Sequence, residues 1–195
     1  TNRGAAYANL NLHERAIEDY DKALELNPKY AMAYHNRGGA YANLKQYERA
    51  IEDYNKAIEL NPNYAKAYGN RGIAYSEIGK YEESVRDMKK SGILFFYSGR
   101  EDNAVKVFSI CFKLREEIES DDVIYCGIAL FLLTLNPEVI LALRKMKAQD
   151  ETLRKIFDLA LVKLRGKDIS NRIAMLEEKE KTGEKKILLE LLKRL

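Results

Sequence analysis

Small and aromatic residues recur at spacings of three and four along the N-terminal half of this chain, which is the spacing of one face of an α-helix. One such stripe holds Tyr34, Gly38 and Tyr41, and a second holds Ala50, Tyr54 and Ala57. Asn61-Pro62 then ends one helix and starts the next, because the residue before proline avoids the α region and proline fits only a first turn. The pattern therefore predicts pairs of helices joined by short turns.

The residues themselves repeat with a period of 34. Shifting the chain by 34 aligns 1–34 with 35–68, and 25 of the 34 positions are then identical. The next shift aligns 35–68 with 69–102 at 10 identical positions, and the repeat fades beyond residue 82. Shared composition does not produce such identity. The identity between the aligned segments indicates copies of one two-helix unit, and stacked copies can bury a continuous core.

The unit resembles the tetratricopeptide repeat, which has small, aromatic and proline residues at set positions. The middle unit supplies Tyr34, Gly38, Tyr41, Ala50, Tyr54, Ala57 and Pro62 in the family's order, and the first unit supplies Gly4, Tyr7, Ala16, Tyr20, Ala23 and Pro28. In the third unit, Ser84 and Met88 replace the alanine and the second aromatic residue, and Phe96 stands where proline is expected. Without that proline, the second helix of this unit should continue to Tyr97.

This resemblance implies an all-α fold, a right-handed superhelical solenoid of antiparallel helix pairs followed by further C-terminal helices. We expect a tetratricopeptide array over residues 1–98, with three repeats of which the first is truncated and the third degenerate. An alternative register is a degenerate unit whose first helix overlaps the extended one. It rests on a fainter pattern: Gly92, Phe95, Gly99, Ala104 and Phe108.

Residues 99–195 are predicted to be a second helical region that continues or caps the stack, and no family resemblance covers 100–195. We expect helices near 101–118, 121–135, 137–148, 151–165, 168–181 and 184–195. One face of the last helix carries Leu188, Leu191, Leu192 and Leu195. We interpret this stripe as packing on the preceding helices to cap the stack. The alternative is a helix that binds a partner or a second copy.

The resemblance implies that the first helix of each unit lines a concave groove. The predicted peptide-binding residues are Asn2, Asn9, His35, Asn36, Asn43, Lys66, Asn70 and Glu77. Asn2, Asn36 and Asn70 occupy the same position of successive units and form a ladder. Because an asparagine amide both donates and accepts, it can pair with the N–H and C=O of a ligand backbone. The alternative is that these amides only cap or brace neighbouring helices.

These features favour a protein–protein interaction scaffold or adaptor that binds a partner polypeptide in the groove. A narrower reading is the clamp with which some co-chaperones hold the C-terminal carboxylate of heat-shock chaperones. Of the five clamp positions, Asn36 and Lys66 match. The other three hold Thr1, Ala5 and Asn70, which removes most of the charged donors that such a carboxylate needs. We therefore disfavour the clamp.

The sequence leaves two other functions open. One is a structural module that self-associates through its terminal helices, and the other is nucleic-acid binding by the basic C-terminal helices. Residues 141–195 carry 15 Lys and Arg against 9 Asp and Glu, a net charge of +6. The two signs alternate, however, and Phe157 is the single aromatic residue there, whereas single strands are usually bound by stacking on aromatic side chains. We do not expect nucleic-acid binding.

Nothing in the sequence indicates catalysis, a metal site or a cofactor. His13 and His35 lie in different predicted helices and lack ligand spacing to Cys111 or Cys126. Phosphate-loop, dinucleotide and zinc-protease motifs are absent, so we expect no enzyme. Both cysteines lie in apolar runs, so we expect buried free thiols and no disulfide. Free thiols are typical of a reducing compartment, which predicts a cytoplasmic protein. The apolar run 124–135 is shorter than the ~20 residues of a membrane span.

Overall fold

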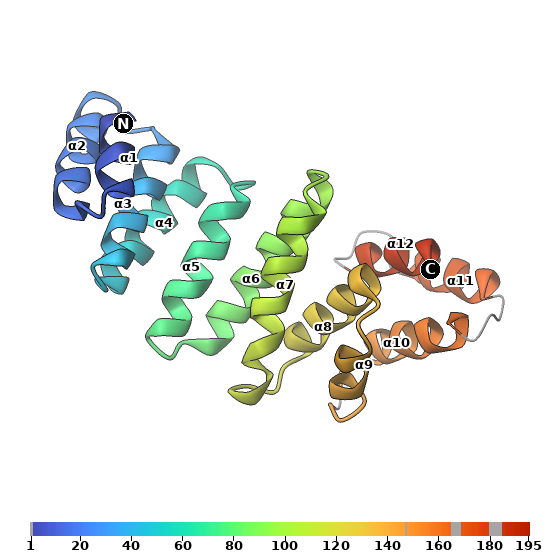
Figure 1. Cartoon of the computed structure of the whole chain (residues 1–195). Helices are drawn as coiled ribbons and strands as arrows, with labels where there is room; N and C mark the ends of the chain where they lie inside the picture. The colour runs from blue at the N-terminus through green and yellow to red at the C-terminus, as the bar shows by residue number, and fades with distance from the viewer. Residues whose placement is uncertain (1, 147, 165–168, 180–184) are drawn as a thin grey trace. The chain divides into compact units, whose positions relative to one another are not determined.

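The computed structural model describes residues 2–146, 148–164, 169–179 and 185–195, and every element within them is helical (Figure 1). The predicted all-α class is therefore confirmed. The chain divides into two compact units, Thr1–Leu94 (unit 1) and Phe95–Leu195 (unit 2). Thr1 and the predicted helix ends at 165, 168, 181 and 184 lie outside the described residues. The domain boundary at residue 98 stays a prediction.

Unit 1 is built from helix hairpins. Its helices are α1 (Asn2–Asn9), α2 (His13–Leu26), α3 (Ala31–Asn43), α4 (Tyr47–Leu60), α5 (Ala65–Glu77) and the larger part of α6 (Tyr81–Tyr97). Each helix packs on the next, α1 on α2, α2 on α3, α3 on α4 and α4 on α5. This is the stacking of helix pairs that the repeat predicts.

The turns inside the three hairpins are copies of one another. Each contains a residue with positive φ, namely Asn11 (58°), Lys45 (58°) and Gly79 (75°). The N–H of the following residue bonds a carbonyl of the helix that has just ended, at 2.9 Å in all three: Leu12 to Tyr7, Gln46 to Tyr41 and Lys80 to Tyr75. Such turns satisfy carbonyls at the helix end that otherwise lack a partner.

The glycine of the repeat pattern marks a place where paired helices approach closely. A Cβ atom on Gly38 would lie 2.9 Å from the ring of Tyr54 and 3.1 Å from the carbonyl oxygen of Ala50. Tyr54 and Ala50 belong to a core cluster with Tyr41 and Ile51. The residues that carry the resemblance are therefore the contact residues of the hairpin.

Helix α6 ends at Tyr97, as the absence of proline at position 96 predicted. The two residues that depart from the repeat pattern, Ser84 and Met88, are both buried, with exposed fractions of 0% and 2%. Ser84 donates a long contact of 4.0 Å to the Met88 sulfur. The third unit thus keeps its packing although its pattern is altered.

Unit 2 begins with a fourth copy of the hairpin turn. Gly99 has φ 71°, and the Arg100 N–H bonds the Phe95 carbonyl at 2.9 Å. The helix that follows, α7 (Glu101–Lys113), buries Ala104 and Phe108 completely. These are the residues of the overlapping register, so the local geometry from Phe95 onward supports that alternative.

The other elements of unit 2 surround one buried helix. They are a 3-10 turn (Leu114–Glu116), α8 (Asp121–Thr134), α9 (Pro137–Leu143), α10 (Glu151–Lys163), α11 (Ser170–Lys179) and α12 (Lys186–Arg194). In α8 every residue from Val123 to Leu132 is buried, and the helix contacts α7, α9, α10 and α12. The Asp121 carboxylate accepts the backbone N–H groups of Gln149 and Asp150 at 2.8 and 2.9 Å, which ties the start of α10 to α8.

The apolar stripe of α12 is covered within unit 2. Ile187, Leu188, Leu189, Leu191 and Leu192 are each exposed by 1% or less. The helix contacts α8, α10 and α11, and Lys163 Nζ donates to the carbonyls of its last turn at 3.0 and 2.9 Å. Leu188, Leu191 and Leu192 of the predicted stripe therefore pack on preceding helices, as interpreted from the sequence, whereas Leu195 is only partly buried. None of the helices in the described residues is long and apolar enough to cross a membrane.

Candidate functional site

Three of the predicted groove residues form one hydrogen-bonded chain across α3 and α5. His35 Nδ1 lies 3.1 Å from Asn36 Oδ1, and Asn70 Nδ2 lies 3.1 Å from His35 Nε2. Because the Asn36 oxygen can only accept, the ring proton sits on Nδ1, and Nε2 accepts from the Asn70 amide. The His35 ring also packs on the rings of Tyr64 and Tyr54, with centroids 4.8 and 5.8 Å away. Both nitrogens of the imidazole therefore have partners, and two tyrosine rings pack against it.

This environment keeps His35 neutral. Burial lowers the pKa of His35 below its ordinary value of 6.5, and the positive charge of Lys66 lowers it further, while the hydrogen bond to Asn36 opposes both. Burial raises the pKa of the neighbouring Tyr54, and Asn70 opposes that shift. A neutral imidazole is the form that can accept from Asn70.

Acidification is expected to weaken unit 1 through His35. A group whose pKa is lowered on folding binds protons more readily in the unfolded chain. Its stabilisation is therefore complete above 6.5, the ordinary pKa, and is lost as pH falls below it. Thermal unfolding at about pH 7.5 and about pH 5.5 should show a larger fall in Tm for the wild type than for His35→Gln, whose amide donates and accepts without titrating. Equal falls in Tm would contradict this.

Beside this chain of hydrogen bonds lies a small cavity, which we call the α3–α5 hollow. It has a volume of about 210 Å³ and is lined by Gly39, Ala42, Asn43, Tyr47, Tyr54, Asn70, Ile73 and Ala74. At its edge Tyr47 Oη donates to Glu77 Oε2 at 3.1 Å, and Ile73 is 43% exposed. Pockets for small molecules measure about 300–1,000 Å³. The hollow is smaller and suits a single side chain.

The structure groups six of the eight predicted residues. His35, Asn36 and Asn70 are bonded to one another, and Lys66 acts on the charge of His35. Asn43 lines the hollow, and Glu77 holds the tyrosine at its edge. Asn2 and Asn9 are exposed on α1, and no hydrogen bond within the described residues joins them to the α3–α5 group. Their role as groove residues stays a prediction.

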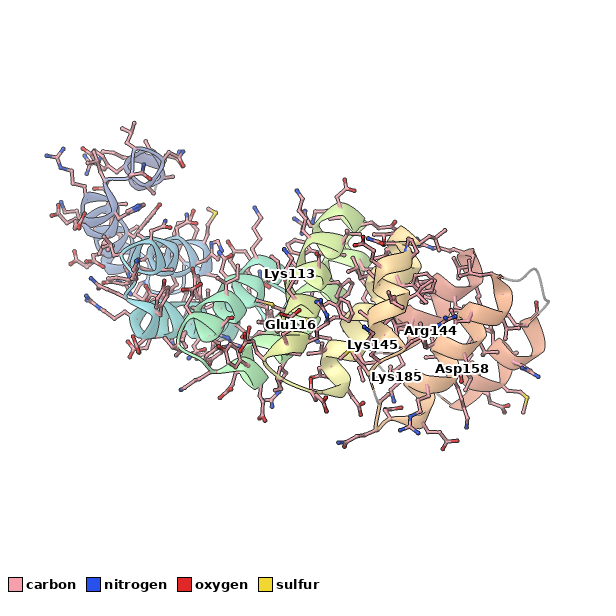
Figure 2. The ribbon with its side chains drawn as sticks, turned by 60° about the horizontal axis from the view of Figure 1, so that its bottom comes forward. Lys113, Glu116, Arg144, Lys145, Asp158 and Lys185 are labelled. Carbon is pink, nitrogen blue, oxygen red and sulfur yellow. The ribbon has the colours of Figure 1, made fainter. Side chains whose placement is uncertain are left out.

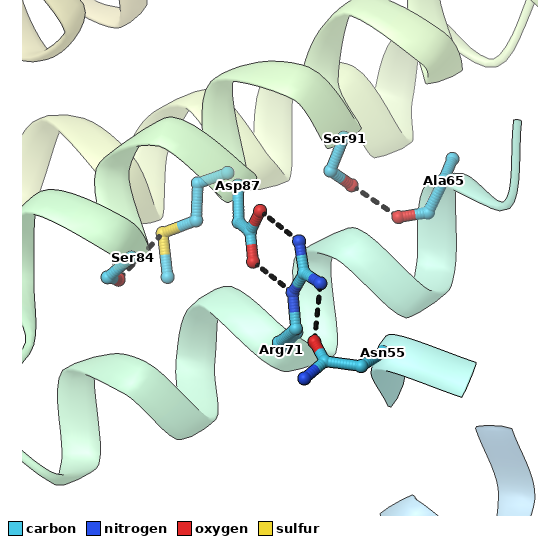
Figure 3. Close-up of polar contacts among 7 residues, drawn as sticks. Asn55, Ala65, Arg71, Ser84, Asp87 and Ser91 are labelled. Carbon is cyan, nitrogen blue, oxygen red and sulfur yellow. Dashed lines mark hydrogen bonds and ion pairs between the residues drawn. The ribbon is translucent and has the colours of Figure 1, made fainter. Parts of the chain in front are cut away.

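A second ladder, which the sequence analysis did not single out, holds the helices of the site in place. Arg37 donates to Asp53 of α4 through Nε (2.8 Å) and Nη2 (2.6 Å), and to Asp21 of α2 through Nη1 (2.6 Å). Arg71 repeats this with Asp87 of α6 and Asn55 of α4 (Figure 3). Each arginine thus joins its own helix to the second helix of its own unit and to that of the unit before.

The signal for this ladder was present in the sequence. Arginine occurs at positions 3, 37 and 71 and aspartate at 19, 53 and 87, so both recur every 34 residues and stand 16 residues apart. Arg37 and Arg71 directly follow Asn36 and Asn70. Their bidentate ion pairs therefore set the rotation of the helices that carry the asparagines.

Stacked hairpins with matching turns, joined by ion pairs that recur every 34 residues, define a helical-repeat protein. Residues 1–30 and 31–64 match the tetratricopeptide-repeat family model, and residues 53–86 match a second model of the same repeat. The chain belongs to the tetratricopeptide-repeat family. The comparison with curated proteins gave no match.

Several solved structures are similar. The second tetratricopeptide-repeat domain of human RPAP3, in complex with HSP70 peptide SGPTIEEVD, is 30% identical with a TM-score of 0.50, over 56% of this chain and 89% of that one. The Sgt2 domain from Aspergillus fumigatus is 27% identical with a TM-score of 0.54, over 60% and 76%. The TPR2B domain of yeast Sti1, in complex with pHsp70, is 24% identical with a TM-score of 0.57, over 59% and 92%, and supports the fold alone.

Proposed function

We propose that this chain is a protein-interaction adaptor that binds an extended segment of a partner polypeptide across α3 and α5. The observation that carries the proposal is the α3–α5 hollow, a cavity of about 210 Å³ with apolar walls and two asparagine amides, Asn43 and Asn70. One aliphatic side chain of the ligand fills the hollow. The amides beside it pair with the ligand backbone on either side of that residue.

The hydrogen bonds of His35 support a preformed site. Asn36 and Asn70 are held by the ring before any ligand arrives, so little side-chain entropy is lost on binding. The similar human RPAP3 domain was solved with a bound peptide, which supports the same class of ligand here. The proposed role is non-enzymatic and cytoplasmic, as the sequence analysis expected.

Recognition of a C-terminal carboxylate is not part of the proposal. Asn70 stands at a clamp position that would need a charged donor, and its amide carries no charge. Ala5, at another clamp position, has no polar side-chain atom. Lys66 is exposed and is the cation among the clamp positions in the described residues. One exposed cation supplies little of the charge-assisted bonding that a clamp requires.

Gly39 allows a direct test of the hollow. A Cβ on Gly39 would meet only the Tyr54 hydroxyl, at 3.9 Å, so side chains are tolerated there. Gly39→Leu should fill the hollow, while Gly39→Ala should leave it open, and both gain about 1 kcal/mol of helix propensity. Peptides selected from a phage-displayed random library on the wild type, measured by calorimetry, should bind Gly39→Ala like wild type and Gly39→Leu about tenfold more weakly or worse.

The selected peptides should share an aliphatic residue at one position, and replacing it with alanine should weaken binding to Gly39→Ala but not to Gly39→Leu. Peptides that bind all three proteins equally would place the ligand elsewhere. A library that yields no peptide for the wild type would refute the proposed function. Thermal unfolding of both variants confirms that the protein is folded in each measurement.

A further inference from the structure

A cavity in the described part of unit 2 has no role in the function proposed above. It has a volume of about 650 Å³ and lies among α8, α9 and α10. Its lining residues are Ile124, Ile128, Leu143, Arg144, Met146, Ala148, Leu153, Arg154, Phe157, Asp158 and Leu161. Figure 2 labels two of them, Arg144 at the end of α9 and Asp158 on α10. The volume falls within the range of about 300–1,000 Å³ that is typical of pockets for small molecules.

The interior of this cavity is apolar. Ile128 and Leu153 are exposed by 0% and 2%, so they form its floor. Phe157, Leu161 and Met146 are only half-buried and lie toward solvent. On α10, residues 153, 157 and 161 are spaced by four and therefore form one stripe along the wall. The cavity therefore has a buried end and a more exposed end, which suits an elongated ligand.

Two arginines give the lining a net positive charge. Arg144 and Arg154 are exposed, and neither guanidinium group has a hydrogen bond or an ion pair to any residue that the structure describes. Asp158 is the one acidic residue among the lining residues, which leaves a net charge of +1. Neighbouring lysines differ: Lys155 pairs with Glu151 at 2.6 Å and Lys185 with Asp150 at 2.5 Å. The guanidinium groups at the cavity are therefore available to an anion.

We propose that this cavity binds an elongated amphiphile with an anionic head group, of the size of a medium-chain fatty acid. The aliphatic tail fills the apolar interior toward Ile128, and the carboxylate pairs with Arg144 and Arg154. A partner helix fits less well. The wall on α10 runs from Leu153 to Leu161, about 12 Å of helix, which is too short to cover the apolar face of a helix of ordinary length.

A fluorescent fatty acid provides the test on the full chain. The protein contains no Trp, so 11-(dansylamino)undecanoate can be followed without interference from protein emission. Dodecanoate should displace this probe saturably, and dodecan-1-ol should do so about tenfold less well, because it lacks the charge. Arg144→Gln with Arg154→Gln should weaken dodecanoate about tenfold. The matched pair Lys145→Gln with Lys155→Gln removes the same charge beside the cavity and should change affinity by less than about twofold.

Leu161→Trp should block probe binding by filling the cavity, and the arginine pair keeps the test open if that variant does not fold. Gly39→Leu should bind the probe like wild type, since the α3–α5 hollow lies in unit 1. Equal affinity for the acid and the alcohol, or no effect of the arginine pair, would overturn the proposal. Displacement by an acidic amphipathic peptide but not by dodecanoate would also overturn it and would assign the cavity to a polypeptide.

Discussion

Replacing Arg37 with leucine is expected to lower the free energy of unfolding by about 3 kcal/mol, the cost of leaving a buried charge without its partner. Arg37 binds the Asp53 carboxylate with two nitrogens, and the Asp53 side chain is only 8% exposed. Burial raises the pKa of Asp53 even with Arg37 in place, although the arginine opposes the shift. Without the guanidinium, either the carboxylate stays charged in a poorly solvated site or it takes up a proton.

Urea unfolding of wild type, Arg37→Leu, Arg3→Leu and Arg37→Leu with Asp53→Asn would measure this. Arg3 makes the same bidentate contact with Asp19, whose side chain is also 8% exposed, but Arg3 itself is 68% exposed, whereas Arg37 is 20% exposed and also pairs with Asp21. The loss of Arg3 should therefore cost less. Adding Asp53→Asn should recover part of the lost stability, because the stranded charge is removed. Equal losses for Arg3→Leu and Arg37→Leu, or no recovery in the double variant, would show that the ladder is not what holds the helices.

The second large effect is expected in α12. Leu192→Ala should destabilise unit 2 by about 3 kcal/mol, since a fully buried leucine loses its transfer free energy and leaves a cavity. Leu192 is 0% exposed, and α12 contacts α8, α10 and α11. Hydrogen exchange should show faster amide exchange in residues 95–195, while amides of the α3–α4 hairpin keep their protection.

Leu195→Ala, at the C-cap of the same helix, is the matched control. Leu195 is only partly buried at the end of the chain, so its loss should cost less than about 1 kcal/mol. Sedimentation velocity adds a second measurement. A change in molecular mass with unchanged stability in Leu192→Ala would mean that the stripe serves a contact between copies, contrary to its packing in unit 2.

Much of the fold could be predicted because its determinants are local. Helical spacing, the proline at position 62 and the repeat of 34 residues defined the hairpins of unit 1. Even the departure from the pattern was informative, since Phe96 in place of proline predicted that α6 would continue to Tyr97. Helix continuation depends on one missing restraint within a turn of the residue, and that is visible in the chain alone.

The candidate site was predicted only in part. The repeat placed His35, Asn36 and Asn70 on corresponding faces, but nothing in their spacing showed that the ring of His35 would join the two amides. That bond joins residues 35 positions apart and depends on how closely α3 and α5 approach. The arginine ladder was overlooked for a different reason. Its periodicity was visible, but exposed charges at such spacing usually contribute little, and only burial makes them important.

By itself, the sequence determined the helices, their turns and the stacking of pairs, because these follow from local sterics and a short repeated pattern. The tertiary structure alone decided which polar groups bond to one another, where the α3–α5 hollow and the larger cavity of unit 2 open, and that the stripe of α12 is covered. The physical reason is that hydrogen bonds and cavities change with differences of less than about 1 Å in the spacing of helices. That spacing results from the packing of all side chains at once.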